Sequence, residues 1–266
     1  MKNNKKTPSQ TERISCVLLA GTEPRSIKEI ALIPAYHGPR ILPIRHEYIA
    51  AAVEDYVDCD PSCRLVDAFH ACPENAARYI GLFDVKTTGC DDFRWVIGAT
   101  NSMDGTLSFS LHSGIVIPGA EMAIAFHASE RLIGRKGYVP REEIPNLVNE
   151  NLFILRDHYN LCIERMDHLK SCKLTSPAAA ELILSLFGTE VIAGRMAYEF
   201  IMAWKKPQFD YLKPRTMWSL YCLCAWFLKR LRDVVMIDRT MNLNHFFDDM
   251  SKFDKKPTRW VQSTFA

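Results

Sequence analysis

The sequence predicts an α+β fold in which an antiparallel β-sheet, built as a meander, is followed by a helical C-terminal half. Between residues 60 and 119, short runs rich in β-branched and aromatic residues are separated by Pro, Gly, Asn or Asp, with no helical pattern between them. Over residues 144–254 the apolar residues instead recur at helical spacing. We therefore expect a single α+β domain over residues 14–254.

The N-terminal region is the least regular part of the sequence. Residues 1–13 are polar and contain three lysines, which indicates a disordered tail and no signal peptide. Residues 24–45 contain four prolines, and we expect extended segments there with short strands at "IALIPA" and "RILPI". Residues 46–57 have the composition and spacing of a helix.

The sheet is predicted from four runs. They are residues 64–71, 77–87, 93–99 and 106–117. In the last run, apolar residues alternate with Ser108, Ser110 and His112, which is typical of a strand with one face in solvent. Asn101 to Gly105 are expected to form the turn before this run, with Asp104-Gly105 supplying the positive φ that such a corner needs.

The chain changes character after Gly119. Residues 120–133 are expected to form a helix, and a basic connector with Gly and Pro follows. Five further helices are expected at residues 144–170, 177–187, 189–204, 215–235 and 243–253. Ser176 is the predicted N-cap of the second of these, with Pro177 at its first position and Gly188 at its end. Residues 255–266 are expected to be a basic tail.

The composition limits the function classes. A chain of 266 residues that is 48% hydrophobic can bury a core without disulfides or metals. Its formal net charge is +2, so only local clusters of charge can indicate nucleic acid. Nine scattered cysteines indicate reduced thiols and a cytoplasmic protein. No apolar run is long enough to predict a transmembrane helix, so we expect no membrane partner.

The sequence contains no catalytic signature. It lacks G-x-S-x-G, a phosphate-binding G-x-x-x-x-G-K-[ST] and G-x-G-x-x-G, so we expect no catalytic residues and no cofactor. Cys59 and Cys63, followed by His70 and Cys72, form the best candidate metal site, because zinc binds thiolates and imidazoles. A typical zinc knuckle has two residues between its cysteines and a second pair of ligands further along the chain. Because this sequence has neither, ordinary thiols near a turn are the favoured interpretation.

Four aspartates flank the predicted turns of the sheet. They are Asp84, Asp91, Asp92 and Asp104. Clustered carboxylates could bind a divalent cation, but Asp is also a favoured turn residue, and the second interpretation is the stronger. An enzyme whose active-site residues are dispersed along the sequence is therefore the least favoured of three functional classes, and the other two are given below.

Positive charge gathers locally in the sequence. Residues 205–232 contain seven Lys and Arg residues against one acid, with aromatic residues among them. Cations for phosphates and exposed rings for stacking are the requirements of single-stranded nucleic-acid binding. The candidate phosphate contacts are Lys205, Lys206, Lys213, Arg215, Arg135 and Lys136, with Tyr138 or Tyr211 stacking on bases. The alternative is that the lysines cover a solvated face and the aromatic residues belong to the core.

Two segments resemble a known family. They are "NSMDGTLSFSLHSGIVIPGAEMAI", residues 101–124, and "PRTMWSLYCLCAWFLKRL", residues 214–231. They resemble an uncharacterised phage- and plasmid-associated domain family with an Asn-Ser-x-Asp-Gly-like turn and a Trp-x-Leu-Tyr-Asn-Ala-x-Thr-Glu-like C-terminal helix. The resemblance covers about residues 75–250 and retains the turn. The Asn of the helix motif falls on Cys222 and its Thr-Glu on Ala225-Trp226, so this sequence lacks those polar residues of the motif.

The layout of a sheet followed by helices is also similar to that of the ring-forming single-strand annealing proteins of phages. This resemblance implies DNA-backbone binding in a basic groove, without a nucleotide cofactor, and a homo-oligomer. We therefore expect a phage or mobile-element DNA-binding protein whose partner is single-stranded DNA, acting in annealing or recombination. The alternative is a phage-encoded protein-interaction factor whose partner is a host protein, and which inhibits a host defence or a host enzyme.

Overall fold

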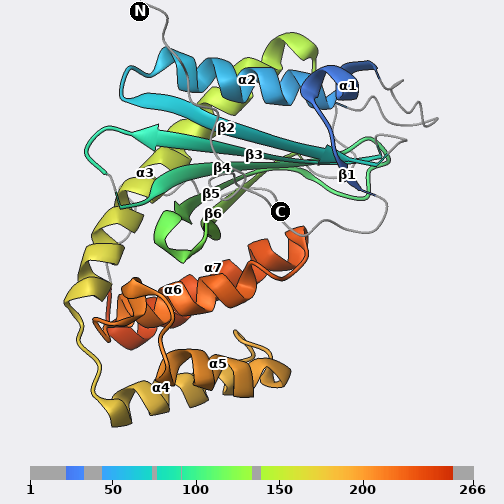
Figure 1. Ribbon diagram of the computed structural model, residues 1–266. Coiled ribbons are helices and arrows are strands. Elements are labelled where there is room, and N and C mark those ends of the chain that lie inside the picture. Colours follow the sequence, from blue (N-terminus) through green and yellow to red (C-terminus); the bar gives the residue numbers. More distant parts are fainter. Residues whose placement is uncertain (1–21, 33–43, 74–76, 91, 134–138, 254–266) are drawn as a thin grey trace, which may run out of the picture.

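A six-stranded antiparallel sheet organises the computed structural model, which describes residues 22–32, 44–73, 77–90, 92–133 and 139–253 (Figure 1). The strands are β1 (Glu23–Pro24), β2 (Cys63–Cys72), β3 (Arg78–Thr87), β4 (Arg94–Ser102), β5 (Phe109–Ile117) and β6 (Ala123–Ile133). Their order in the sheet follows their order in the chain. The predicted antiparallel meander is therefore confirmed.

The helix predicted over residues 120–133 is wrong, because residues 123–133 form the sixth strand. This strand pairs with β5 from Ile117↔Ala123 to Phe109↔Ile133. Its Ala and Glu residues favour a helix in isolation. Pairing with β5 overrides that preference, since the strand buries Ala123 and Phe126 on opposite faces of the sheet. The sheet thus extends beyond residue 119.

The solvent-facing side predicted for residues 107–112 is also wrong. Every residue of β5 is buried, and Ser110 and His112 are only 8% and 6% exposed. Helix α7 (Asp233–Ser251) packs beside β6 and places Met236 and Ile237 against this face of the sheet. The polar side chains of β5 therefore lie beneath a helix that the local alternation does not predict.

Seven α-helices are described. They are α1 (Ile27–Leu32), α2 (His46–Cys59), α3 (Ile144–Ser171), α4 (Ser176–Gly188), α5 (Ala197–Lys205), α6 (Met217–Leu228) and α7. Short 3₁₀ turns lie at Pro118–Ala120, Arg141–Glu143, Gly194–Met196 and Asp210–Leu212. The helices predicted at 46–57, 144–170 and 177–187 are confirmed.

The N-terminal region departs from prediction in its described part. Residues 27–32 form helix α1 instead of the strand expected at "IALIPA". The reason is a local capping box, in which Ser26 accepts from the Glu29 N–H while the Glu29 carboxylate accepts from the Ser26 N–H. The strand expected at "RILPI" and the tails at 1–13 and 255–266 lie outside the described residues, apart from Ile44.

Three helix boundaries in the C-terminal half also differ. Thr175, not Ser176, is the N-cap of α4 and accepts from the Ala178 N–H. Helix α5 begins only at Ala197, and the helices predicted at 215–235 and 243–253 are divided differently, as α6 and α7. Helix α6 ends in a tight turn, where the Leu231 N–H bonds the Leu228 carbonyl.

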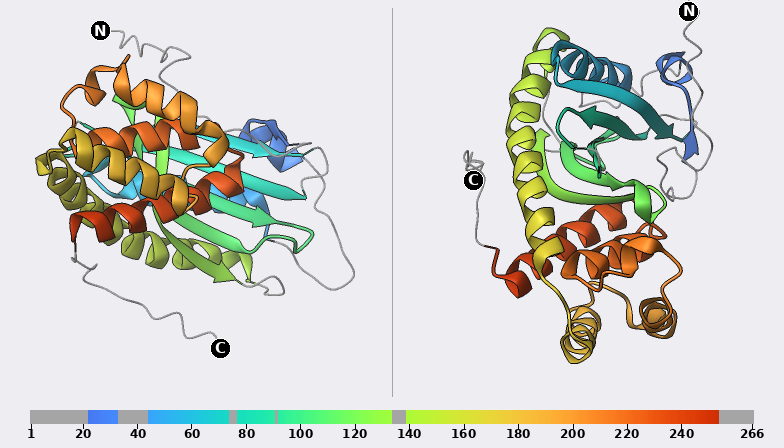
Figure 2. Two further views of the ribbon diagram at one scale, coloured as in Figure 1. Left: turned by 90° about the horizontal axis from the view of Figure 1, so that it is seen from below. Right: turned by 60° about the vertical axis from the view of Figure 1, so that its left-hand side comes forward.

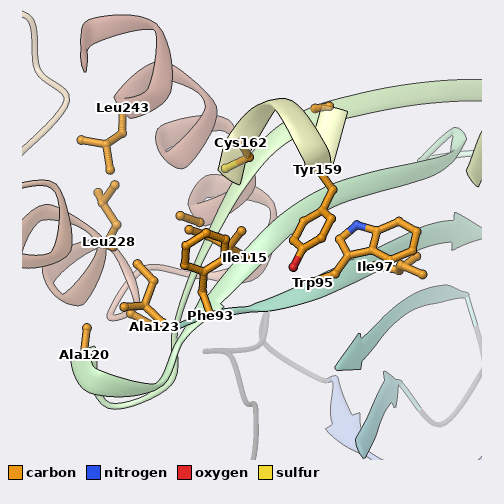
Figure 3. Packing of buried hydrophobic residues seen from close by; sticks show 14 of the residues in the cluster. Phe93, Trp95, Ile97, Ile115, Ala120, Ala123, Tyr159, Cys162, Leu228 and Leu243 are labelled. Atoms are coloured by element: carbon orange, nitrogen blue, oxygen red, sulfur yellow. The ribbon is translucent and has the colours of Figure 1, made fainter. Parts of the chain in front are cut away.

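The larger core lies between the sheet and helices α2, α3 and α6 (Figure 3). Trp95 of β4 is fully buried, donates its indole N–H to the Ser113 hydroxyl over 2.8 Å, and stacks on Tyr159 of α3 at 5.6 Å between ring centroids. The Tyr159 hydroxyl in turn bonds Thr87 over 2.9 Å. The buried rings thus keep their polar atoms paired.

A smaller core lies between the other face of the sheet and α7. Strand β6 has a bulge opposite Ser113, and α7 bonds the backbone of Phe126 beside it. The Phe126 N–H donates to the Thr240 hydroxyl over 3.0 Å, and its carbonyl accepts from the Asn244 amide over 2.8 Å. Two side chains of α7 therefore continue the hydrogen bonding of the sheet.

Helices α4 and α5 lie side by side at the end of the molecule farthest from α2 (Figure 2). The chain enters this region after α3 and leaves it before α6, and the two crossings are hydrogen-bonded to each other. The Leu174 N–H donates to the Arg215 carbonyl and the Met217 N–H to the Cys172 carbonyl, both over 2.8 Å. We call these paired segments, residues 172–174 and 215–217, the neck.

Candidate functional site

Five of the eight predicted nucleic-acid contacts lie at the end of α5 and in the loop from α5 to α6. They are Lys205, Lys206, Tyr211, Lys213 and Arg215. The other three, Arg135, Lys136 and Tyr138, lie outside the described residues. The five share one end of the molecule, but their side chains have different roles.

Arg215 holds the C-terminal end of α5. Its guanidinium donates to the carbonyl of Trp204 and, over 3.4 Å, to that of Lys205. Carbonyls at a helix end lack partners inside the helix, so these contacts cap α5. The guanidinium also lies 4.6 Å from the centroid of the Trp204 ring. Arg215 has φ 54°, a left-handed conformation that costs about 1 kcal/mol for a non-glycine residue and that these contacts stabilise.

Lys213 and Tyr211 also contact the protein itself. The Lys213 ammonium lies 2.5 Å from the carboxylate of Asp210, and both side chains are exposed, so the pair contributes little to stability. The Tyr211 ring stacks on Phe209 at 5.2 Å, and its hydroxyl is buried with no hydrogen-bond partner in the described part of the chain. Burial raises the pKa of that hydroxyl. The Tyr211 ring is therefore packed against its neighbours and is not a free stacking surface.

Lys205 and Lys206 are exposed, and no ion pair or hydrogen bond of their side chains is found among the described residues. Neighbouring cations are engaged. Lys229 donates to a backbone carbonyl and Arg230 pairs with Glu199 over 2.7 Å. Much of the local positive charge predicted from residues 205–232 is thus used within the protein.

An apolar groove of about 520 Å³ lies between α4 and α5. It is lined by Leu174, Thr175, Ser176, Ala179, Ala180, Ile183, Leu184, Ile201, Trp204, Lys205 and Arg215. Two alanines on the α4 side leave room between the helices. Leu184 is 68% exposed, although full burial of a leucine contributes about 1.5–3 kcal/mol. The groove therefore offers apolar surface that the protein itself does not cover.

Two cationic side chains and a helix N-terminus lie at one end of the groove. Thr175 and Ser176 place the N-terminus of α4 there, where the helix dipole is positive. Lys205 and Arg215 line the same groove. Leu184 lies two turns further along α4, so the groove combines an apolar stretch with a positive end.

A second, smaller hollow lies on the other side of α5. Its volume is about 320 Å³, and Tyr198, Lys206, Phe209 and Trp226 are among its lining residues. Tyr198 is 80% exposed. In this hollow an exposed lysine meets one exposed ring, Tyr198, and two partly buried rings, Phe209 and Trp226.

The Asn101–Gly105 segment is held by one contact to helix α2 and its N-terminal neighbour and by one set of local hydrogen bonds. The Asn101 amide donates to the Ile44 carbonyl over 2.8 Å and bonds the Nδ1 atom of His46 over 3.0 Å. The Asp104 carboxylate accepts from the N–H and hydroxyl of Thr106 at 2.9 and 2.6 Å, and Gly105 has φ 71°. The predicted corner between two antiparallel strands is confirmed, but it begins only at Met103, because Asn101 and Ser102 still pair with β3 as the end of β4.

The four residues of the candidate thiol site do not contact one another in one group, and each has its own surroundings. Cys59 is exposed on α2, whereas Cys63 contacts the Arg156 guanidinium at 2.6 Å and donates to Asp60 over 3.4 Å. Burial raises the pKa of the Cys63 thiol. His70 and Cys72 lie on β2, and the His70 ring bonds the Tyr79 hydroxyl over 2.9 Å. Within the described ranges, no three His, Cys, Asp or Glu residues form a group that could hold a metal ion.

The described aspartates at the turns of the sheet do not form a cluster either. Asp84 is fully buried and makes a two-pronged contact with the Arg94 guanidinium, at 2.7 Å for each bond. Asp92 pairs with Lys170 over 2.6 Å, and Asp91 lies outside the described residues. Each described aspartate of this set has its own partner.

Sequence reasoning missed the groove, because it depends on the spacing between two helices. One signal was present in residues 182–187, "LILSLF", which place apolar residues around most of the circumference of α4. A helix at the protein surface normally buries one stripe only. Such an excess of apolar residues indicates either a fully buried helix or a binding surface.

The fold and the site together define an α+β protein with an open apolar groove between two helices at one end. Comparison with protein-family models, with curated proteins and with solved structures finds no match for this chain. Among the described helices, none combines the length and the apolar character that crossing a membrane requires.

Proposed function

We propose that this chain is a protein-interaction factor that binds a segment of another protein in the groove between α4 and α5. The observation that supports this proposal is the uncovered apolar lining of that groove, with Leu184 exposed at 68%. Exposed apolar surface in a concave site is typical of helix-in-groove recognition. This function corresponds to the second of the two expected from the sequence, a phage-encoded factor that inhibits a host defence or a host enzyme.

The groove favours a partner segment of particular chemistry. Apolar side chains of the segment would contact Ile183, Leu184 and Ile201. An acidic side chain or a chain-terminal carboxylate would lie at the positive end, near Lys205 and the N-terminus of α4. We therefore propose an amphipathic segment of a host protein, apolar along its length and acidic at one end.

Single-stranded DNA binding is the second candidate function. It is favoured by one observation, that Lys206 lies in the smaller hollow together with Tyr198, Phe209 and Trp226. It ranks second because Lys213 and Arg215 already have partners within the protein. Few free cations near the described rings provide few phosphate contacts, and phosphate contacts dominate nucleic-acid affinity.

Site-specific crosslinking tests the first proposal. A photoreactive phenylalanine analogue replaces Leu184 in the groove and, as the matched control, Leu32, an exposed leucine on α1. After irradiation in host lysate, we expect one protein to be captured at stoichiometric yield from position 184 and not from position 32. Equal capture from both positions would contradict the proposal.

The captured protein is then purified and its affinity is measured against two variants. Leu184→Asp should weaken binding at least tenfold, because it removes apolar contact and adds a charge, while Leu32→Asp should leave the affinity unchanged. In parallel, fluorescence anisotropy measures binding of labelled oligo-dT at physiological salt. Tight oligo-dT binding that survives Leu184→Asp and is lost in Lys205→Glu/Lys206→Glu would instead establish the DNA function.

A further inference from the structure

A small polar cavity lies at the opposite face of the sheet from α3, where strands β4, β5 and β6 approach α7. Its volume is about 150 Å³. Thr100, Ser110 and His112 line it from the sheet, Arg131 from β6 and Asp238 from α7. It is separate from the α4–α5 groove and from Lys205, Lys206, Lys213 and Arg215, the predicted cationic residues that the structure describes.

Buried polar side chains line the sheet side of this cavity. Thr100, Ser110 and His112 are 9%, 8% and 6% exposed, on a sheet face that is otherwise packed with apolar side chains. The Nε2 atom of His112 bonds the Thr100 hydroxyl over 3.1 Å. Its Nδ1 atom is buried with no hydrogen-bond partner among the described residues. Unpaired polar atoms are rare in protein interiors, and this one lies on a residue that lines a cavity.

The imidazole is neutral at physiological pH, because burial lowers the pKa of His112 to about 4. A neutral ring presents either a donor or an acceptor at Nδ1, depending on its tautomer. The sheet side of the cavity therefore offers the hydroxyl groups of Thr100 and Ser110 beside a neutral ring, without a net charge.

Opposite charges line the outer part of the cavity. Arg131 and Asp238 are both exposed, and neither makes an ion pair with another described residue. Two charged side chains that bond the lining residue Thr106 are already engaged, since the Asp104 carboxylate accepts two hydrogen bonds from Thr106 and Arg78 donates to the Thr106 hydroxyl. Among the described lining residues, Arg131 and Asp238 are thus available to a ligand.

We propose that this cavity binds a small zwitterion, a free α-amino acid. Its carboxylate would pair with Arg131, its ammonium group with Asp238, and its side chain would contact the hydroxyls of Thr100 and Ser110. The volume holds roughly five water molecules, which suits an amino acid with a small polar or methyl side chain. A simple anion would face the Asp238 carboxylate, and a neutral polyol would use neither charge.

Titration of the ¹⁵N-labelled protein with L-serine, followed by the imidazole nitrogen signals, tests the proposal. The signals of His112 are assigned by their absence in His112→Gln. We expect a saturable shift of these signals with L-serine or L-alanine, and at least tenfold weaker binding of acetate and of methylammonium, which each carry one of the two charges.

Two exposed-residue variants complete the test. Arg131→Gln and Asp238→Asn should each weaken L-serine binding at least tenfold, with circular dichroism unchanged. The proposal is overturned if neither amino acid gives a saturable shift. It is also overturned if acetate binds as tightly as L-serine and Asp238→Asn has no effect, because the site would then be one for simple anions.

Discussion

Asn101 ties helix α2 to the sheet from the end of β4, in the segment that resembles a family motif. It is 4% exposed, and its amide donates to the Ile44 carbonyl and bonds the His46 ring. Asp104, by contrast, makes its hydrogen bonds within an exposed turn. The two residues are three positions apart in the sequence but have different energetic importance.

Replacing Asn101 by leucine should therefore lower the free energy of unfolding by about 2–3 kcal/mol, because a buried carbonyl and a ring nitrogen lose the amide that bonds them. Asp104→Ala, the control in the same turn, should cost less than about 1 kcal/mol, because water replaces its exposed contacts. Urea denaturation of both variants gives the comparison. Equal losses would show that Asn101 does not link α2 to the sheet.

The turn geometry could be predicted from the sequence, but the role of Asn101 could not. Asp-Gly is a local signal for positive φ, and Gly105 has it. The partner of Asn101 is Ile44, 57 positions away in the chain, and no local pattern indicates such a contact. The roles of the cationic residues could not be predicted for the same reason. The sequence shows that Arg215 is basic, but only the structure shows that it caps α5.

The pairing of β5 with β6 depends on close backbone contact at Gly114. A Cβ atom at this position would lie 2.8 Å from the Ala125 carbonyl oxygen and 3.0 Å from the Phe126 Cα. Both are backbone atoms of the neighbouring strand, which cannot move aside as a flexible side chain can. Gly114 therefore marks the point where the bulge brings the two strands together.

Gly114→Ala should lower the free energy of unfolding by about 1–3 kcal/mol through this overpacking. Gly188→Ala is the matched control, because a Cβ at the end of α4 meets nothing within 4 Å. The control should be neutral or stabilise by up to about 1 kcal/mol. Thermal unfolding of the two variants gives the comparison, and a Gly114→Ala variant as stable as the control would contradict this account of the strand pairing.

Among the secondary-structure elements, long helices with regularly spaced apolar residues could be predicted from the sequence, whereas β6 could not. Helices α2, α3 and α4 carry clear apolar spacing and end near the predicted residues. The residues of β6 lack such a signal, and β5 selects their conformation by pairing. The break between α6 and α7 was missed because residues 229–232 keep a helical composition.

Across the described part of the molecule, several buried or half-buried histidines have a lowered pKa. Burial lowers the pKa values of His70, His112, His127 and His158 below the ordinary value of 6.5. The unfolded chain then binds protons that the folded protein does not. The stability from these groups is present above pH 6.5 and is lost as the pH falls below it.

For His112 the loss should continue down to its folded pKa of about 4 and reach about 3 kcal/mol. His112→Gln keeps a group that can bond Thr100 but removes the titration. Urea denaturation at several pH values between 7.5 and 4 should therefore give a shallower pH dependence for this variant than for the original protein. Parallel curves would mean that His112 is not kept neutral by burial.

The α+β class followed from local patterns, whereas the sites did not. Strand alternation, turn residues and helical spacing are properties of short segments, and they predicted the meander and the helical half. The groove, the polar cavity and the burial of both faces of β5 arise when α4, α5 and α7 pack in three dimensions. Contacts between segments far apart in the chain produce little local pattern in a single sequence, so they are hard to predict from it.

The neck has a consequence for how this protein can diversify. The chain enters the α4–α5 region through one of these segments and leaves it through the other, and the two segments are hydrogen-bonded to each other. The chain between them therefore begins and ends at the same place on the rest of the protein. Lengthening, shortening or exchanging the chain between the two segments leaves every strand of the sheet beside the same neighbour. In evolution, or in a designed chimera, the surface of the α4–α5 groove can therefore be replaced as a unit while the sheet that supports it stays the same.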